Sequence, residues 1–250
     1  MSAEPLIAAF VDYENLELGV RDMKVGTFRI ELILKRLLEK GRIVHKRAYC
    51  DWSNHAKAVR EFHSQGIELI DIPRSKMSGK NSADIRMVVA AIDLCYSKSH
   101  IDLFALLTGD SDFSPLVSKL KENDKRVIGC GVKNSTSKLL IANCDEFIFY
   151  DDLLREVKPA RQRKSRPEED RADRAIERLV EIVRSLERDY DLIWGSMVKQ
   201  TIRRVYPEFN ENYAGYQSFN ELLKEAEKRK AIRLEYDPER GNYKVRSSEG

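Results

Sequence analysis

The chain has 250 residues, enough for one large domain or two small ones, with 42% hydrophobic and 34% charged residues and a net charge of only +3. No run of about 18 apolar residues occurs, which argues against a transmembrane helix and for a globular protein with a buried core. Residues 1–5 carry no basic segment, and the apolar stretch 6–11 is too short for a signal-peptide core, so we expect a cytoplasmic protein.

The first 150 residues alternate between short apolar runs and helical patterns. Apolar runs typical of buried strands occupy residues 6–11, 42–49, 67–72, 103–107, 127–132 and 146–149. Helical patterns cover residues 28–39, 56–65 and 138–143, and further helices are expected to begin at Ser82 and at Ser114-Pro115. This alternation predicts an α/β fold with a doubly wound, mostly parallel sheet, whose ligands bind where the strand order reverses.

The composition changes after residue 152. Residues 155–166 (REVKPARQRKSR) are strongly basic, so we expect a linker over residues 153–169 that is either a solvated tether or a phosphate contact. Helical patterns follow at 172–187, 193–205 and 218–230, and two alternating segments, 232–236 and 243–245, enclose a Gly-containing turn. Three helices and a hairpin predict a small winged helix-turn-helix domain over residues 170–250.

The four cysteines give no sign of a zinc site or of disulfides. They form no C-x-x-C pair and no cluster with histidine at zinc spacing. We therefore expect free thiols, buried or half-buried, in a reducing compartment: Cys50, Cys95, Cys130 and Cys144.

Four aspartates are expected at one edge of the predicted sheet. Asp12 directly follows the first strand, Asp110 and Asp112 follow the fourth, and Asp84 lies in the first turn of a helix that enters the same edge. If the first and fourth strands are neighbours, these side chains converge, and their mutual repulsion calls for a cation. Mg²⁺ or Mn²⁺ suits such oxygen ligands and can activate a water molecule toward a phosphodiester.

These positions also admit other interpretations. An aspartate at a strand end often caps a helix or forms an Asx-turn, and Asp84 needs no metal at a helix N-terminus. A haloacid-dehalogenase-type phosphatase requires aspartate where Glu14 stands. A phosphoacceptor receiver domain also places its functional residues at strand ends, and here these would be Asp12, Asp71, Thr108 and Lys133. That interpretation leaves Asp110 and Asp112 without a role.

The segments Val11-Asp12-Tyr13-Glu14-Asn15, Ser82-Ala83-Asp84 and Thr108-Gly109-Asp110-Ser111-Asp112-Phe113, in this order, resemble the NYN domain, a LabA-like branch of the PIN-like nuclease superfamily. The resemblance covers about residues 5–152. It implies a PIN-like sheet and Mg²⁺- or Mn²⁺-dependent RNA cleavage. In the implied site, Asn15 orients Asp12 or the scissile phosphate, Thr108 and Ser111 hydrogen-bond the acids, and the metal-binding and catalytic acids are Asp12, Asp84, Asp110 and Asp112.

The tail from about residue 170 resembles the OST-HTH domain, also called LOTUS. The segments that carry this resemblance are residues 193–198 (IWGSMV), 206–210 (YPEFN) and, most specifically, 215–223 (GYQSFNELL). Such domains bind RNA or dock proteins, so the resemblance implies a C-terminal module that recruits RNA or a protein partner.

A basic loop before Asp84 and two aromatic residues are candidates for holding RNA. Arg74, Lys76 and Lys80 could contact phosphates, although a solvated loop explains them equally well. Tyr13 and Trp52 follow strand ends and could stack on unpaired bases, with packing of Trp52 against the next helix as the alternative. We therefore predict an endoribonuclease acting on single-stranded RNA, or else a non-catalytic RNA- or protein-binding adaptor on the same fold.

Overall fold

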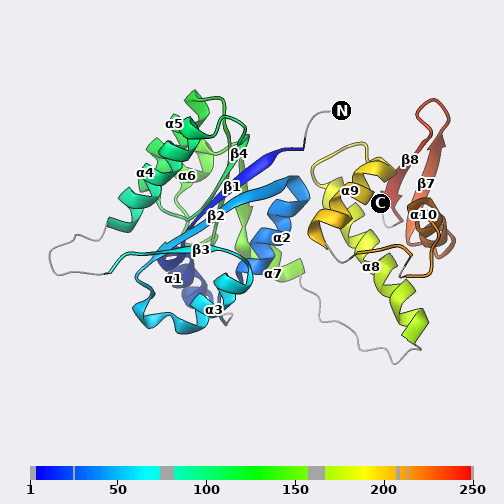
Figure 1. Ribbon diagram of the computed structural model, residues 1–250, viewed down its shortest axis with the longest axis horizontal. Coiled ribbons are helices and arrows are strands. Elements are labelled where there is room, and N and C mark those ends of the chain that lie inside the picture. Colours follow the sequence, from blue (N-terminus) through cyan, green and yellow to red (C-terminus); the bar gives the residue numbers. More distant parts are fainter. Residues whose placement is uncertain are drawn as a thin grey trace. The chain divides into compact units, whose positions relative to one another are not determined.

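The computed structural model describes residues 4–24, 26–73, 82–156, 167–206, 209–212 and 214–248. The chain divides into two compact units, residues 1–37 with 41–158, and residues 38–40 with 159–250 (Figure 1). Each unit has a hydrophobic core of its own. Within the described residues, no helix combines the length and the apolar character needed to cross a lipid bilayer.

A six-stranded, all-parallel sheet forms the centre of the first unit. Its strands lie in the order β3-β2-β1-β4-β5-β6, so the order reverses between β1 and β4. This confirms the predicted α/β fold and the predicted neighbourhood of the first and fourth strands. The strands are β1 (Leu6–Asp12), β2 (Arg42–Cys50), β3 (Glu68–Asp71), β4 (Leu103–Leu107), β5 (Arg126–Gly131) and β6 (Glu146–Phe149).

Helices cover both faces of this sheet (Figure 1). One face packs against α4 (Ser82–Ser97), α5 (Ser114–Glu122) and α6 (Lys138–Asn143), and the other against α1 (Tyr13–Met23), α2 (Ile30–Lys40), α3 (Ala56–Ser64) and α7 (Tyr150–Glu156). Short 3-10 turns, η1 (Trp52–Asn54) and η2 (Ser111–Phe113), follow β2 and β4.

Burial on both faces explains why the central strands β1 and β4 read as unbroken apolar runs. Along β1, Ile7, Ala9 and Val11 point into the core beneath α1–α3, whereas Ala8 and Phe10 point into the core beneath α4–α6. All five side chains are at most 1% exposed. In the two central strands β1 and β4, polar side chains therefore occur only at the strand ends, which is where Asp12 and Thr108 lie.

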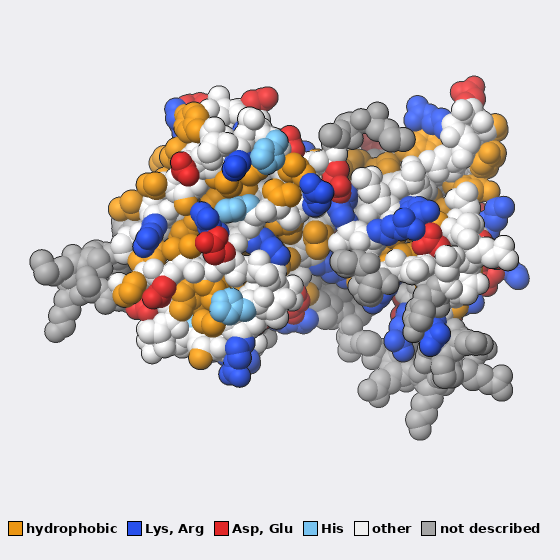
Figure 2. Space-filling view, viewed as in Figure 1, with side chains coloured by type: hydrophobic (Ala, Val, Ile, Leu, Met, Phe, Trp, Pro, Cys, Tyr) orange, Lys and Arg blue, Asp and Glu red, His pale blue; other side chains and the backbone are white. Residues whose placement is uncertain are grey.

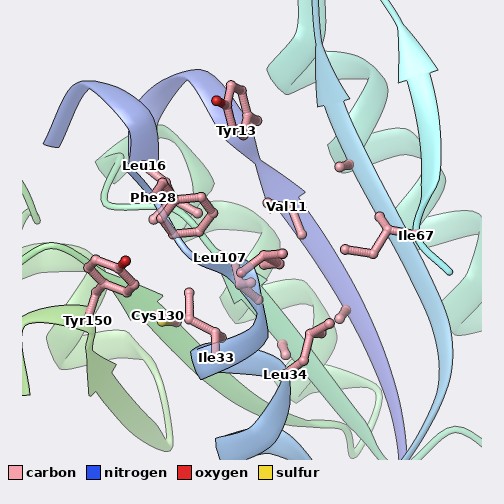
Figure 3. Packing of buried hydrophobic residues seen from close by; sticks show 14 of the residues in the cluster. Val11, Tyr13, Leu16, Phe28, Ile33, Leu34, Ile67, Leu107, Cys130 and Tyr150 are labelled. Carbon is pink, nitrogen blue, oxygen red and sulfur yellow. The ribbon is translucent and has the colours of Figure 1, made fainter. Parts of the chain in front are cut away.

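The core beneath α1–α3 reaches up to the strand ends (Figure 3). Val11 and Leu107 from the sheet lie near Leu16 of α1, and the aromatic rings of Phe28 and Tyr150 lie at the side of the same cluster. The Tyr150 hydroxyl accepts a hydrogen bond from the Arg29 backbone N–H at 2.9 Å, which satisfies a buried polar group. This packing holds α1 against the sheet where β1 ends.

The second unit contains the predicted three helices and hairpin. Its elements are α8 (Pro167–Glu187), α9 (Gly195–Val205), α10 (Phe219–Lys228) and the antiparallel strands β7 (Ile232–Asp237) and β8 (Asn242–Ser247). Leu179, Val183, Ile202, Leu222 and Val245 are each at most 1% exposed and belong to one core. The helices and the hairpin therefore bury a common apolar face.

Candidate active site

The ends of β1 and β4 lie side by side at the switch point of the sheet. Val11 pairs with Leu107, so Asp12 and Thr108 are the next residues on neighbouring strands. The buried Thr108 hydroxyl donates a hydrogen bond to Asp12 Oδ2 at 2.9 Å and accepts one from the Asp110 backbone N–H at 3.2 Å. One threonine thereby fixes the carboxylate of Asp12 relative to the loop that carries Asp110.

Asn15 joins the same two segments from the other side. Its backbone N–H donates to Asp12 Oδ1 at 3.2 Å, so Asp12 caps α1, and its side-chain oxygen accepts the Gly109 N–H at 2.8 Å. Gly109 must be glycine here, since a Cβ atom would lie 2.9 Å from the Ser135 carbonyl oxygen. Asn15 therefore orients Asp12 through the backbone and positions the 108–110 loop through its side chain.

Asp110 and Asp112 leave the β4 end on η2. The Asp110 carboxylate accepts the Asp112 backbone N–H at 2.9 Å and so caps this short turn. Asp84 lies in the first turn of α4, as expected. Ser111 begins η2, but within the described chain no hydrogen bond joins its hydroxyl to any of the four carboxylates.

The four aspartates share one electrostatic environment. Burial, with the nearby charges of Asp84 and Asp110, raises the pKa of Asp12 to about 7, against the opposing effect of its hydrogen bonds from Thr108 and Asn15. Burial also raises the pKa of Asp84, and the charges of Asp110, Asp112 and Glu14 raise it further. All four predicted acids therefore lie within electrostatic reach of one another at one edge.

Glu14 is an acidic group at this edge that the sequence analysis did not assign to the metal site. It lies in the first turn of α1, two residues after Asp12, and its charge acts on Asp84. The signal that could have identified it is its position in the turn that Asp12 caps. Carboxylates clustered in this way favour bound cations because a cation relieves their repulsion.

The donor set fits a hard divalent cation that keeps much of its water. Among the described residues, no three or more His, Cys, Asp and Glu side chains lie close enough together to form a ready-made metal cage. Mg²⁺ commonly needs only one or two carboxylates, with water and substrate phosphate completing an octahedron. Oxygen-only donors, partial burial and excess negative charge at this edge meet that requirement.

The predicted role of Tyr13 in RNA stacking is wrong. Its ring is only 6% exposed and packs against four aromatic neighbours with centroid distances of 5.1–6.2 Å: Phe28, Trp52, His55 and Phe62. Trp52 is also buried, and its indole N–H donates to the Ile70 carbonyl at 3.1 Å. Both rings therefore hold η1 and α3 against α1 and are not available to bases.

Three further expectations can be compared with the observed arrangement. The basic residues Arg74, Lys76 and Lys80 lie outside the described residues. The receiver-domain alternative fails, because β3 is an edge strand and β2 separates Asp71 from Asp12. The Asp71 carboxylate instead accepts the Trp52 backbone N–H at 3.2 Å. The expected free thiols are present, with Cys50, Cys95 and Cys130 buried and Cys144 half-buried.

Comparison with known proteins identifies a family for the part of the chain that carries this site. Residues 6–153 match the NYN domain. An uncharacterized protein of Methanocaldococcus jannaschii is 34% identical over 115 residues, which is 45% of each chain, so this chain spans about half of that relative. A crystal structure of a protein of unknown function from Vibrio parahaemolyticus superposes with a TM-score of 0.54 and 28% identity, over 61% of this chain and 97% of that one.

Proposed function

The chain belongs to the NYN domain family, and we propose that it is a divalent-metal-dependent endoribonuclease that hydrolyses single-stranded RNA. NYN domains are PIN-like, and members of that superfamily are generally nucleases that use divalent metals. The observation that carries the proposal is the shared electrostatic environment of Asp12, Asp84, Asp110 and Asp112 at the switch point. Ligand sites of doubly wound sheets occur at this point.

In the proposed site these four aspartates would hold one or two Mg²⁺ or Mn²⁺ ions, one or two carboxylates binding an ion directly and the others acting through its water molecules. The bound metal would act as a Lewis acid on the phosphodiester and promote ionisation of an attacking water. Thr108 and Asn15 keep the Asp12 carboxylate and the 108–110 loop in place before substrate arrives, so little reorganisation is needed in the reaction. The pKa of about 7 means that the Asp12 carboxyl of the metal-free site ionises near neutral pH.

Substrate contacts are proposed in the basic segment before Asp84 and in the second unit. Arg74, Lys76 and Lys80 would contact phosphates next to the site. We further propose two domains, over about 1–152 and 170–250, joined by a basic linker. The limits of 153–169 expected for the linker are too wide, because α7 continues to Glu156 with Leu153 in the core and α8 begins at Pro167. The second domain would be an OST-HTH/LOTUS-like winged helix that recruits RNA or a protein partner.

The motif that supports this second assignment has a structural role in the unit. Ser218 caps α10 by accepting the Glu221 N–H at 3.2 Å, and Glu221 accepts the Gln217 N–H in return. Leu222 and Leu223 are fully buried. The G-Y-x-S-F-x-E-L-L run therefore begins a helix and anchors it, while any ligand contact would come from its exposed neighbours.

The test is an RNA-cleavage panel with Mg²⁺, Mn²⁺ or chelator, run on the wild type, Asp110→Asn and Asp22→Asn. Asp22 is an exposed aspartate near the end of α1 and serves as the matched control. We expect metal-dependent cleavage by the wild type and Asp22→Asn, and none by a folded Asp110→Asn. Cleavage by Asp110→Asn at the wild-type rate would exclude the proposed site.

A non-catalytic adaptor is the second candidate, favoured by the lack of a ready-made three-ligand cage among the described residues. A ligand that binds only the native state must raise the melting temperature. Millimolar Mn²⁺ should therefore stabilise the wild type if the nuclease proposal holds. No shift in melting temperature, together with no cleavage, would support the adaptor.

A further inference from the structure

Helix α4 carries an apolar stripe that faces solvent. Three of its large side chains are about as exposed as surface charges, with Ile85 at 62%, Val89 at 60% and Tyr96 at 61%, and the half-buried Ile92 lies between them. Residues spaced by four, three and four positions share one narrow sector of a helix. These four residues form the α4 stripe, and Figure 2 shows hydrophobic side chains on the surface of this part of the first unit.

Most of the α4 stripe lies outside the face that packs on the sheet. Met87, Ala91 and Cys95 fill the core beneath α4 and Ile92 packs partly against that core, whereas Ile85, Val89 and Tyr96 face solvent. On one side the stripe adjoins α5, where the Asn123 side-chain amide donates to the Tyr96 hydroxyl at 3.4 Å. Folding of this unit therefore does not require an apolar residue at the three exposed positions.

We infer that the α4 stripe pairs with the same stripe of a second copy of this chain, the two helices running antiparallel. The spacing of the stripe is palindromic, so a two-fold axis places Ile85 opposite the partner's Tyr96. The same axis places Val89 opposite the partner's Ile92. Self-complementarity of this kind is what an isologous dimer interface requires.

The charged residues beside the stripe favour a second copy of this chain as the partner and an antiparallel orientation of the two helices. Arg86 and Asp93 are exposed and border the stripe on one side, one heptad apart. In the antiparallel pair Arg86 lies next to the partner's Asp93, and the contact occurs twice. A parallel pair offers no such charge contact. One cation and one anion also give no net positive charge, so the stripe does not suit nucleic acid.

The pairing would bring two candidate active sites to one interface. Asp84 immediately precedes the stripe in each copy. In the antiparallel arrangement Asp84 lies opposite residue 97 of the other helix, which puts the two Asp84 residues about 20 Å apart along the helix axes at 1.5 Å per residue. The inference itself does not depend on the proposed nuclease activity.

Sedimentation velocity of the full chain over a wide concentration range tests the inference. The wild type should reach a dimer, and Val89→Glu should raise its dissociation constant at least about 100-fold, because two buried carboxylates face an apolar surface. The control is Leu139→Glu on α6, since Leu139 is 58% exposed and outside the stripe. That variant should dimerise like the wild type. A monomeric wild type, or a dimer unaffected by Val89→Glu, would overturn the inference.

Charge exchange tests the antiparallel geometry. Arg86→Asp and Asp93→Arg should each weaken the dimer by placing like charges together, and the double variant should recover most of the lost affinity. Circular dichroism should show an unchanged fold in all three, because both side chains are exposed. Double-variant losses equal to the sum of the single losses would exclude the antiparallel contact.

Discussion

Asp12→Asn is expected to stabilise the metal-free protein above neutral pH. The folded-state pKa of Asp12 is about 7, compared with 3.8 for an unperturbed aspartate, because its carboxylate is buried beside other acids. A raised folded pKa means that the native state holds the proton more tightly than the unfolded state does. The associated stability is complete below pH 3.8 and is lost as the pH rises through 7.

The size of the effect follows from the two pKa values. Between about pH 5 and pH 8.5, ionisation of Asp12 should lower the free energy of unfolding of the wild type by about two pKa units, or about 3 kcal/mol at 1.36 kcal/mol per unit. Asparagine has nearly the same size, and its side-chain oxygen can still accept the Asn15 N–H that caps α1. The variant should therefore keep the local structure while removing the cost of ionisation.

Urea denaturation in chelator at these two pH values measures the difference directly. The free energy of unfolding of the wild type should fall more steeply with pH than that of Asp12→Asn, by about 3 kcal/mol. Adding Mn²⁺ at the higher pH should stabilise the wild type and have little effect on the variant. An equal stability difference at both pH values would refute the assignment of a raised pKa to Asp12.

Three further substitutions test the positioning groups and the corrected role of Tyr13. Thr108→Val removes the hydrogen bond that lowers the pKa of Asp12, so the pH of half-maximal cleavage should rise. The variant should also lose about 1–2 kcal/mol of unfolding free energy. An unchanged pH–rate profile would contradict this. Asn15→Ala leaves the Gly109 N–H unpaired, which should lower kcat more than it changes KM and cost about 1–3 kcal/mol in denaturation. Tyr13→Leu should leave the RNA affinity of the folded protein unchanged in a filter-binding assay because the ring is buried, and a tenfold loss would contradict that packing role.

The sheet and its acidic edge could be predicted because the relevant signals are local. The central strands β1 and β4 are buried on both faces and read as apolar runs, and Asp12 and Asp110 stand where those runs stop. Since parallel strands share one carboxyl edge, two strand-end acids meet whenever their strands are neighbours, as β1 and β4 are. That reasoning needed no knowledge of side-chain packing.

Helix α1 could not be predicted in the same way. Its sequence YENLELGVRDM has few apolar residues, and its stability depends on contacts made elsewhere in the fold. Asp12 caps it, Leu16 and Val20 are buried, and Gly19 allows close approach to Val132. Tyr13 was misjudged for the same reason, because only the tertiary fold brings its aromatic neighbours around it. The side chain of a residue that follows a strand can point into the core as well as toward solvent.

The central claim is that the aspartate edge supports attack of water on an RNA phosphodiester. Its most direct test is Mn²⁺-dependent cleavage of an RNA oligonucleotide in which the nucleotide at the cut site carries 2′-O-methyl in place of the 2′-hydroxyl. Because the proposed nucleophile is water, the wild type should still cut this linkage and leave no 2′,3′-cyclic phosphate, and Asp110→Asn should not cut it. Loss of cleavage with the modified RNA, or a cyclic phosphate product from the unmodified RNA, would contradict the account.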